Sequence, residues 1–205
     1  ELDAVIAPAA PARRGGERGP ARVLGRFDRM FELGDPPEYE PEPASSIASR
    51  AAREGRDAAA LAYDLLLADD GRAFLYQPIL NYDDGNLDAA GEMLAHPCTV
   101  PGLGDGGAHV GTICDASFPT TLLALWGRDR ARGRLGIPFL VQRHTRDTAR
   151  TVGLHDRGVL APGYRADVNV IDFERLTARR PEMRHDLPAG GKRLVQTADG
   201  YVATL

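Results

Sequence analysis

The alternation of short apolar segments with helical segments over 73–127 most constrains the fold of this chain. AFLYQPIL predicts a buried strand over 73–76, and NLDAAGEMLAHP predicts a helix capped by Asn86. CTVPGL predicts a second short strand, and a glycine-rich loop follows it. The next helix is predicted to open at Ser117 and to stop at Gly127. This order predicts parallel strands joined by right-handed helical crossovers.

Two capped helices are predicted before this alternation. Ser45-Ser46 provides N-caps for a helix over 47–54, and Gly55 provides its stop. Asp57 caps a second helix, whose leucines recur at helical spacing and therefore predict one buried face. The residues 69–71, Asp-Asp-Gly, predict the turn that ends it.

The pattern changes after PFLVQRHTRDTARTVG, which predicts one more helical segment. Val159-Leu160 and residues 168–171 predict two short strands, separated by the turn residues Pro162-Gly163. No helical segment lies between them, so they predict a small β layer apart from the β/α units. We expect this layer to pack with strands from a segment N-terminal to Glu1.

The first 43 residues are dense in proline, glycine and charge, which predicts an irregular, exposed connection. Within it, RVLGRFDRMFEL is compatible with a short strand or a helical turn. The chain starts at Glu1 rather than Met and stops in the apolar run YVATL. We therefore expect an incomplete chain.

Composition excludes several classes of protein. The net charge of −4 argues against a nucleic-acid-binding surface, and no apolar run approaches the ~18 residues of a membrane span. Two cysteines among 205 residues are too few for a disulfide scaffold, and they favour the reducing cytoplasm. We expect a soluble protein that binds a small molecule, with no nucleic-acid or membrane partner.

The loop GLGDGGAHVGTICDASFP, residues 102–119, can be read in three ways. Asp105 between glycines fits an ordinary tight turn, and spacing alone favours that reading. The glycines also fit G-x-G-x-x-G, but a dinucleotide site needs a helix at the third glycine, and in this chain Gly111 and Pro119 delay it. In a β/α barrel, an aspartate just beyond a strand points into the active-site mouth, where it can accept a proton from an attacking water. This third reading predicts a metal hydrolase.

Three motifs that occur in the expected order along the chain favour the third reading, because they resemble a known family. The loop, the segment TRDTARTVGLHDRGVLAPGYRADVNVIDF and the helix AREGRDAAALAYDLLLADDG resemble the C-terminal region of the amidohydrolase superfamily. They are most similar to its N-acyl-D-amino-acid deacylase branch. The resemblance implies an α/β fold: the C-terminal part of a metal-dependent hydrolase β/α (TIM-type) barrel plus part of a small β-sandwich. It divides the chain into a connection over 1–44, the last barrel units over 45–153 and a sandwich segment over 154–205.

The resemblance also implies a site. Asp105 would be the catalytic proton shuttle and would sit at a centre of one or two zinc ions. The family's other ligands are a His-x-His pair on the first strand, a bridging residue on the fourth and histidines on the fifth and sixth, and none has a counterpart in this sequence. A barrel alone takes ~250 residues, so the chain would be about half of an enzyme. Many relatives have serine where Gly104 stands.

Further candidates surround the loop. His109 and Asn81 are expected near a barrel mouth as substrate contacts, although His109 fits equally well as a residue that satisfies a loop carbonyl. Asp115 can contact substrate, but together with Ser117 it reads more simply as helix capping. Cys114 reads as a small buried hydrophobe. The arginines at alternate positions 128–134 read as a solvated loop, with an anion site as the alternative.

These observations predict a hydrolase of C–N bonds other than peptide bonds. Its substrate would be an N-acyl-D-amino acid or a related amide, and Asp105 would act as general base and then as general acid. The 205 residues alone are expected to be inactive. The alternatives are a non-catalytic fragment that lacks most metal ligands and, less favoured, a dinucleotide-binding unit built on GLGDGG.

Overall fold

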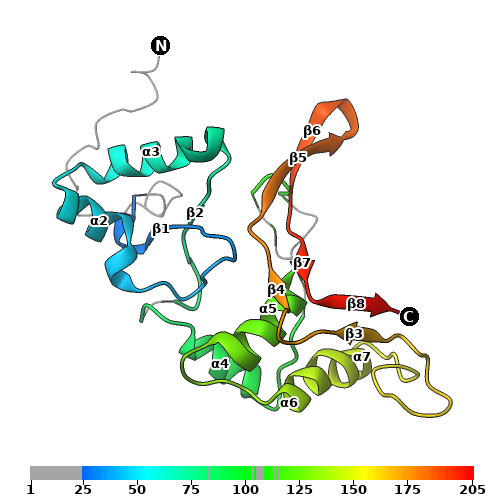
Figure 1. Cartoon of the computed structure of the whole chain (residues 1–205). Coiled ribbons are helices and arrows are strands. Elements are labelled where there is room, and N and C mark those ends of the chain that lie inside the picture. The colour runs from blue at the N-terminus through cyan, green and yellow to red at the C-terminus, as the bar shows by residue number, and fades with distance from the viewer. Residues whose placement is uncertain (1–24, 83, 103, 105–108, 113, 115) are drawn as a thin grey trace.

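The computed structural model describes residues 25–82, 84–102, 104, 109–112, 114 and 116–205. In Figure 1 the helices α2 and α3 lie apart from α4–α7, and the strands that follow α7 form a third group, with the β5–β6 hairpin projecting from it. The helices of the described residues are α2 (Ile47–Glu54), α3 (Ala58–Gly71), α4 (Asp88–Ala95), α5 (Phe118–Ala124), α6 (Ile137–Gln142) and α7 (Thr148–Thr151). Two π-helical segments, η4 (Leu125–Asp129) and η5 (Arg143–Asp147), extend α5 and α6.

The capping predictions for α2 and α3 are confirmed. The Ser46 hydroxyl accepts a hydrogen bond from the Ser49 amide at 3.2 Å, and Asp57 accepts one from the Ala60 amide at 2.9 Å. Gly55 ends α2 with a φ of 63°, a left-handed conformation that glycine adopts without a Cβ penalty. The predicted turn lies inside the last turn of α3, where Asp69 and Asp70 both have a φ of 54°.

The chain before α2 is less irregular than its composition predicts. It forms two 3₁₀ turns, η2 (Phe27–Arg29) and η3 (Pro43–Ser45), and a strand, β1 (Phe31–Glu32), that pairs antiparallel with β2 (Leu75–Tyr76). Met30 packs with Ile47 and Leu61 in a hydrophobic cluster between this segment, α2 and α3. Apolar residues of RVLGRFDRMFEL therefore become core, because they cover the buried faces of the two helices.

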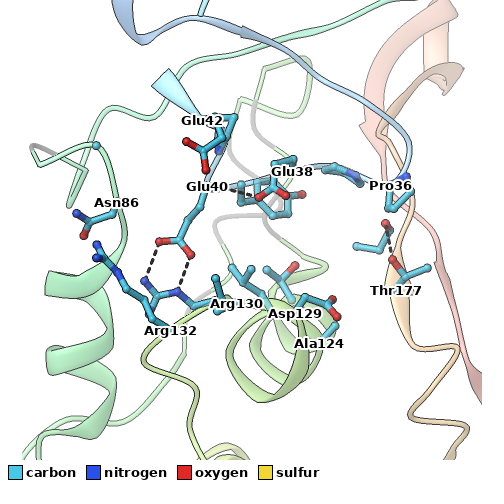
Figure 2. Close-up of a pocket in the computed structure, with 18 of the residues that line it drawn as sticks. Pro36, Glu38, Glu40, Glu42, Asn86, Ala124, Asp129, Arg130, Arg132 and Thr177 are labelled. Carbon is cyan, nitrogen blue, oxygen red and sulfur yellow. Dashed lines mark hydrogen bonds and ion pairs between the residues drawn. The ribbon is translucent and has the colours of Figure 1, made fainter. Parts of the chain in front are cut away.

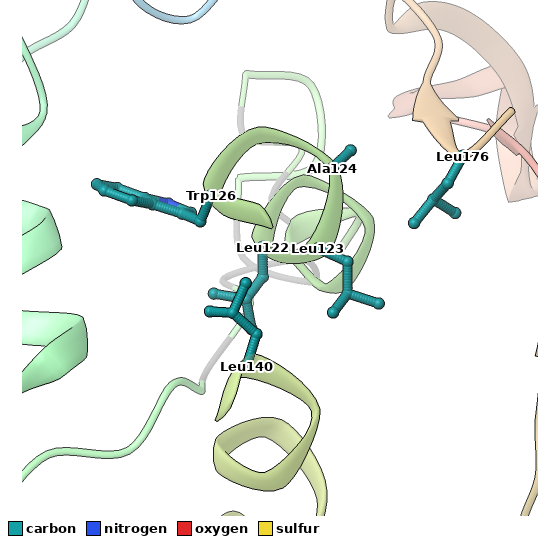
Figure 3. Close-up of a cluster of buried hydrophobic side chains, with 6 residues drawn as sticks. All are labelled: Leu122, Leu123, Ala124, Trp126, Leu140 and Leu176. Atoms are coloured by element: carbon teal, nitrogen blue, oxygen red, sulfur yellow. The ribbon is translucent and has the colours of Figure 1, made fainter. Parts of the chain in front are cut away.

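A second cluster holds the middle of the chain together. Figure 3 shows it around α5 and α6, and its buried members are Leu122, Leu123, Ala124, Trp126, Leu140 and Leu176. Gly127 lies inside η4 rather than after the helix, so its predicted role as a stop is wrong. A Cβ at Gly127 would overlap the Cδ1 atom of Ile137, so a larger residue there would require the Ile137 side chain to move.

The strands of the described residues pair antiparallel, and the predicted parallel pairing is not seen among them. The further strands are β3 (Asn169–Ile171), β4 (Thr177–Ala178), β5 (Glu182–Leu187), β6 (Gly191–Val195), β7 (Ala198–Asp199) and β8 (Tyr201–Thr204), joined as β3–β8, β4–β7 and β5–β6. A third 3₁₀ turn, η6 (Pro188–Gly190), closes the β5–β6 hairpin. The second predicted β segment is confirmed as β3, whose partner comes from the end of this same chain. Val159-Leu160 is not a strand.

The strand predicted from CTVPGL does not form over its described residues either. Two carbonyls of this region, those of His96 and Thr99, accept hydrogen bonds from the buried Arg143 guanidinium instead of from a strand partner. The described helices include none that is both long and apolar enough to cross a membrane.

Candidate active site

A cavity of about 620 Å³ opens between the two described ends of the glycine-rich loop, and we call it the loop cavity. Gly102 and Gly104 line it from one end of the loop, and Cys114 and Ser117 line it from the other. Apolar residues of α4, α5 and η4 form much of the remaining wall: Ala90, Met93, Leu94, Leu122, Leu125 and Trp126. Such a site, apolar with a few convergent polar groups, is typical of small-molecule binding.

The polar groups of the loop cavity come from three distant segments. Ser117 precedes α5, Tyr39 lies in the segment before α2, and Gln196 follows β6. The Gln196 amide donates to the Tyr39 hydroxyl at 3.0 Å, and the Ser117 hydroxyl donates to the Gln196 side-chain oxygen. The Ser117 side chain therefore does not cap α5, which corrects the capping prediction for this residue.

Two aromatic pairs stand at the loop cavity. The Tyr39 and Tyr76 rings meet edge to face with centroids 5.6 Å apart, and burial raises the pKa of the Tyr76 phenol. Phe118 meets His144 in the same way at 5.4 Å. The His144 Nδ1 atom is buried and lacks a hydrogen-bond partner in the part of the chain that the structure describes, and burial lowers the pKa of the imidazole. The Tyr76 phenol and the His144 imidazole are therefore uncharged at neutral pH.

The predicted site residues are only partly placed. Asp105 and Asp115 lie outside the described residues. His109 is exposed, with a φ of 51°, and its carbonyl accepts hydrogen bonds from the Thr112 amide at 2.7 Å and hydroxyl at 3.0 Å. Asn81 is exposed, with a φ of 56°. Neither His109 nor Asn81 is among the residues that line the loop cavity, and their substrate contacts stay predictions.

A second cavity, of about 810 Å³, lies on the other side of Tyr39, and we call it the acidic cavity. Figure 2 shows Glu38, Glu40 and Glu42 facing α5 and η4 across it. Arg130 crosses this space: its Nε atom lies 2.5 Å and its Nη2 atom 2.7 Å from the two oxygens of Glu40. The described residues of the loop do not contribute to its wall.

The arginines at the acidic cavity bond carboxylates and carbonyls of the protein itself. Arg130, with its side chain 2% exposed, also bonds Asp88 at 2.7 Å and stacks 4.3 Å from the centre of the Trp126 ring. The hydrogen bond from Arg130 lowers the pKa of Glu40 despite its partial burial. Arg128 donates to the carbonyls of Glu174 at 3.1 Å and Leu176 at 2.7 Å. Arg128 and Arg130 are thus structural, which corrects the prediction of a solvated loop.

The described residues do not fit a metal centre by themselves. No group of three histidine, cysteine, aspartate or glutamate side chains converges anywhere in the ranges that the structure describes. Catalytic zinc takes about three protein ligands, so the described donor set is insufficient for it.

Comparison with known proteins gives the family. A sequence model described as the amidohydrolase family matches residues 41–204. Two 5-methylthioadenosine/S-adenosylhomocysteine deaminases, from Desulfitobacterium hafniense strains DSM 10664 / DCB-2 and Y51, are each 37% identical to this chain over 86 residues. Each match covers 37% of this chain and 20% of the relative, so the matched part spans about a fifth of the relatives' length. No solved structure gives a significant match.

Proposed function

Because the chain belongs to the amidohydrolase family, we propose that the protein hydrolyses a C–N bond of a small molecule bound in the loop cavity. The observation that carries this proposal is the position of the cavity, between Gly104 and Cys114 on either side of the loop that contains Asp105. Its apolar wall favours a substrate with an apolar group next to the bond that breaks.

The proposed chemistry needs one group that moves a proton twice. The Asp105 carboxylate takes a proton from the water that attacks the carbonyl carbon, and then gives it to the amine as the C–N bond breaks. The products are a carboxylic acid and an amine. For an N-acyl-D-amino acid, the substrate class that the loop motif favours, the amine product is the D-amino acid. We also propose that the enzyme works in the cytoplasm, because its sequence contains only two cysteines.

The metal dependence of the family is proposed for the whole protein. The described residues supply too few ligands for zinc, and we propose that the remaining ligands come from outside them. Metal analysis of the complete gene product should find one or two zinc ions per chain. The 205 residues alone should hold no stoichiometric zinc after dialysis, and zinc that resists a strong chelator in this fragment would contradict the proposal.

A second candidate activity is suggested by the relatives whose names describe them as deaminases. In that reaction water replaces an amino group of a purine and ammonia is released. The identity of 37% over 86 residues favours it, although the match covers a fifth of those enzymes.

One substrate panel separates the two activities. The complete gene product is assayed with N-acyl-D-amino acids, the matching L-isomers and 5-methylthioadenosine, with release of amino acid or ammonia as the readout. Hydrolysis of the D-isomers supports deacylation, and ammonia from the nucleoside supports deamination. An enzyme with bound metal that releases neither product would contradict the proposed function.

A further inference from the structure

The segment around β6 contacts the glycine-rich loop at two places, Val110 and Ser117. The Leu194 amide donates to the Val110 carbonyl at 2.7 Å. Leu194 is also paired with Met183 of β5, so one strand of the projecting hairpin touches the loop directly. In an antiparallel ladder, residues in non-hydrogen-bonded pairs direct their amides away from the partner strand. The edge of β6 that faces away from β5 therefore binds the part of the loop that contains Val110.

The side chain of Gln196 makes a second contact to the loop. Its oxygen accepts a hydrogen bond from the Ser117 hydroxyl, where the loop enters α5. Its nitrogen donates to the Tyr39 hydroxyl at 3.0 Å and to the Arg179 carbonyl at 2.7 Å. A primary amide has two N–H donors and one acceptor oxygen. The Gln196 amide uses all of these groups.

The three residues joined in this way all face the loop cavity. Gln196, Ser117 and Tyr39 each line it, although 79 residues separate Gln196 from Ser117 and 157 residues separate it from Tyr39. One amide thus fixes the cavity wall relative to the end of the loop. An ordinary surface glutamine would not connect three such segments beside a cavity.

We propose that Gln196 is a positioning residue, which holds the end of the glycine-rich loop against the Tyr39 wall of the loop cavity. This inference rests on the proposed function, because the loop contains the proposed proton shuttle, Asp105. Gln196 acts through Ser117 and takes no part in proton transfer. The β segment after the barrel units thereby contributes to the geometry of the site.

The test compares Gln196→Ala, Ser117→Ala and the double variant in the complete gene product. A displacement of about 1 Å at a site costs on the order of 100-fold in rate, so each single variant should lose at least about tenfold in kcat. KM should change less. The double variant should lose no more than Gln196→Ala alone, because that variant has already lost the contact to Ser117.

Two further variants separate positioning from a general loss of structure. Gln196→Glu keeps the oxygen that accepts from Ser117, and its kcat should lie closer to wild type than that of Gln196→Ala. Gln142→Ala is the matched control, because Gln142 is exposed and its side chain donates to the neighbouring Asp147 at 3.2 Å, away from the loop cavity lining. Its kcat should stay within about twofold of wild type. If Gln196→Ala lowers only the unfolding midpoint, or raises only KM, the proposal is overturned.

Hydrogen exchange gives a readout that does not need activity. Amides of residues 110–112 should exchange faster in Gln196→Ala and Ser117→Ala than in wild type, and at the wild-type rate in Gln142→Ala. If wild type hydrolyses no substrate, the proposed function fails, and exchange alone decides the positioning role. Unchanged exchange in Gln196→Ala overturns that role.

Discussion

The two cavities share part of a wall but differ in lining: charged groups surround one, and mostly apolar groups surround the other. Tyr39, Thr121 and Leu125 line both of them. The acidic cavity is the larger, yet its central charges, Arg130 and Glu40, bind each other. The loop cavity is the smaller and more apolar, and it lies at the loop with the proposed catalytic residue. The size of a cavity is thus a poor guide to the functional site, because the larger cavity is built around an ion pair.

The largest effect is expected on the side of the loop cavity. Asp105→Asn keeps the size of the side chain but removes the basic carboxylate. Because general acid–base catalysis contributes ~10²–10⁴-fold, kcat should fall by about that factor. KM should change less, and steady-state kinetics of the complete gene product with bound metal measures both.

The control for this variant is Asp115→Asn. Asparagine caps helices nearly as well as aspartate, so the unfolding free energy should change by about 1 kcal/mol or less and kcat should be retained. Near-normal turnover in Asp105→Asn would make Asp105 a turn residue, and the loop cavity would lose its catalytic group.

On the side of the acidic cavity we expect a loss of stability. Arg130→Ala leaves the Glu40 carboxylate without its bidentate partner and removes the cation above the Trp126 ring. Removing one partner of a buried ion pair costs about 3–5 kcal/mol, and the unfolding free energy in urea should fall by that amount.

Arg132→Ala is the matched control for Arg130→Ala. The Arg132 side chain is 68% exposed and contacts Asp88 at 3.0 Å, so its loss should cost about 1 kcal/mol or less. Equal losses for the two variants would show that the Arg130 network is not a core element.

A smaller effect on the unfolding free energy depends on pH, and we expect it at different pH values for His144 and for Glu40. Burial lowers the pKa of His144 below its ordinary value of 6.5, so the unfolded chain takes up the proton first as pH falls. The unfolding free energy should therefore decrease below pH 6.5, by at most about 1.4 kcal/mol per pH unit for one proton. His144→Leu should remove this decrease, as measured by urea unfolding at several pH values.

The contribution of Glu40, in the acidic cavity, to the unfolding free energy should change at lower pH. The pKa of Glu40 is lowered from 4.5, mainly by Arg130. The contribution of Glu40 to the unfolding free energy is therefore fully present above pH 4.5 and is lost as pH falls through the pKa of the folded state.

His185→Leu, at an exposed position of β5, is the control for His144→Leu and should leave the decrease below pH 6.5 in place. If His144→Leu keeps the wild-type slope between pH 6.5 and 5, burial does not lower the pKa of His144.

Local structure was predictable from the sequence, and long-range pairing was not. Ser46, Asp57 and Gly55 were predicted correctly because caps depend on residues within one helical turn. The strand predicted over CTVPGL was wrong because a strand needs partners that spacing does not reveal, and Arg143 satisfies carbonyls there instead.

The same distinction between local and long-range features applies to the candidate site. The loop and its proposed catalytic aspartate were predicted from a motif, whereas the burial of Arg130 was missed because Glu40 lies 90 residues away in the sequence. Gln196 was missed as well. It stands alone in the sequence, and only the fold brings it to Ser117 and Tyr39.

The most direct test of the account fills each cavity in turn. Val100 lines the loop cavity and Ala131 lines the acidic cavity, and both side chains are accessible, so a tryptophan can replace either one without entering the core. The measurement is kcat/KM of the complete gene product for its best substrate in Val100→Trp and Ala131→Trp. We predict a loss of at least about tenfold in Val100→Trp, because one blocked pocket contact is worth ~10–200-fold, and wild-type values in Ala131→Trp. Full activity in Val100→Trp, with the loss in Ala131→Trp, would contradict the assignment of the loop cavity as the substrate site.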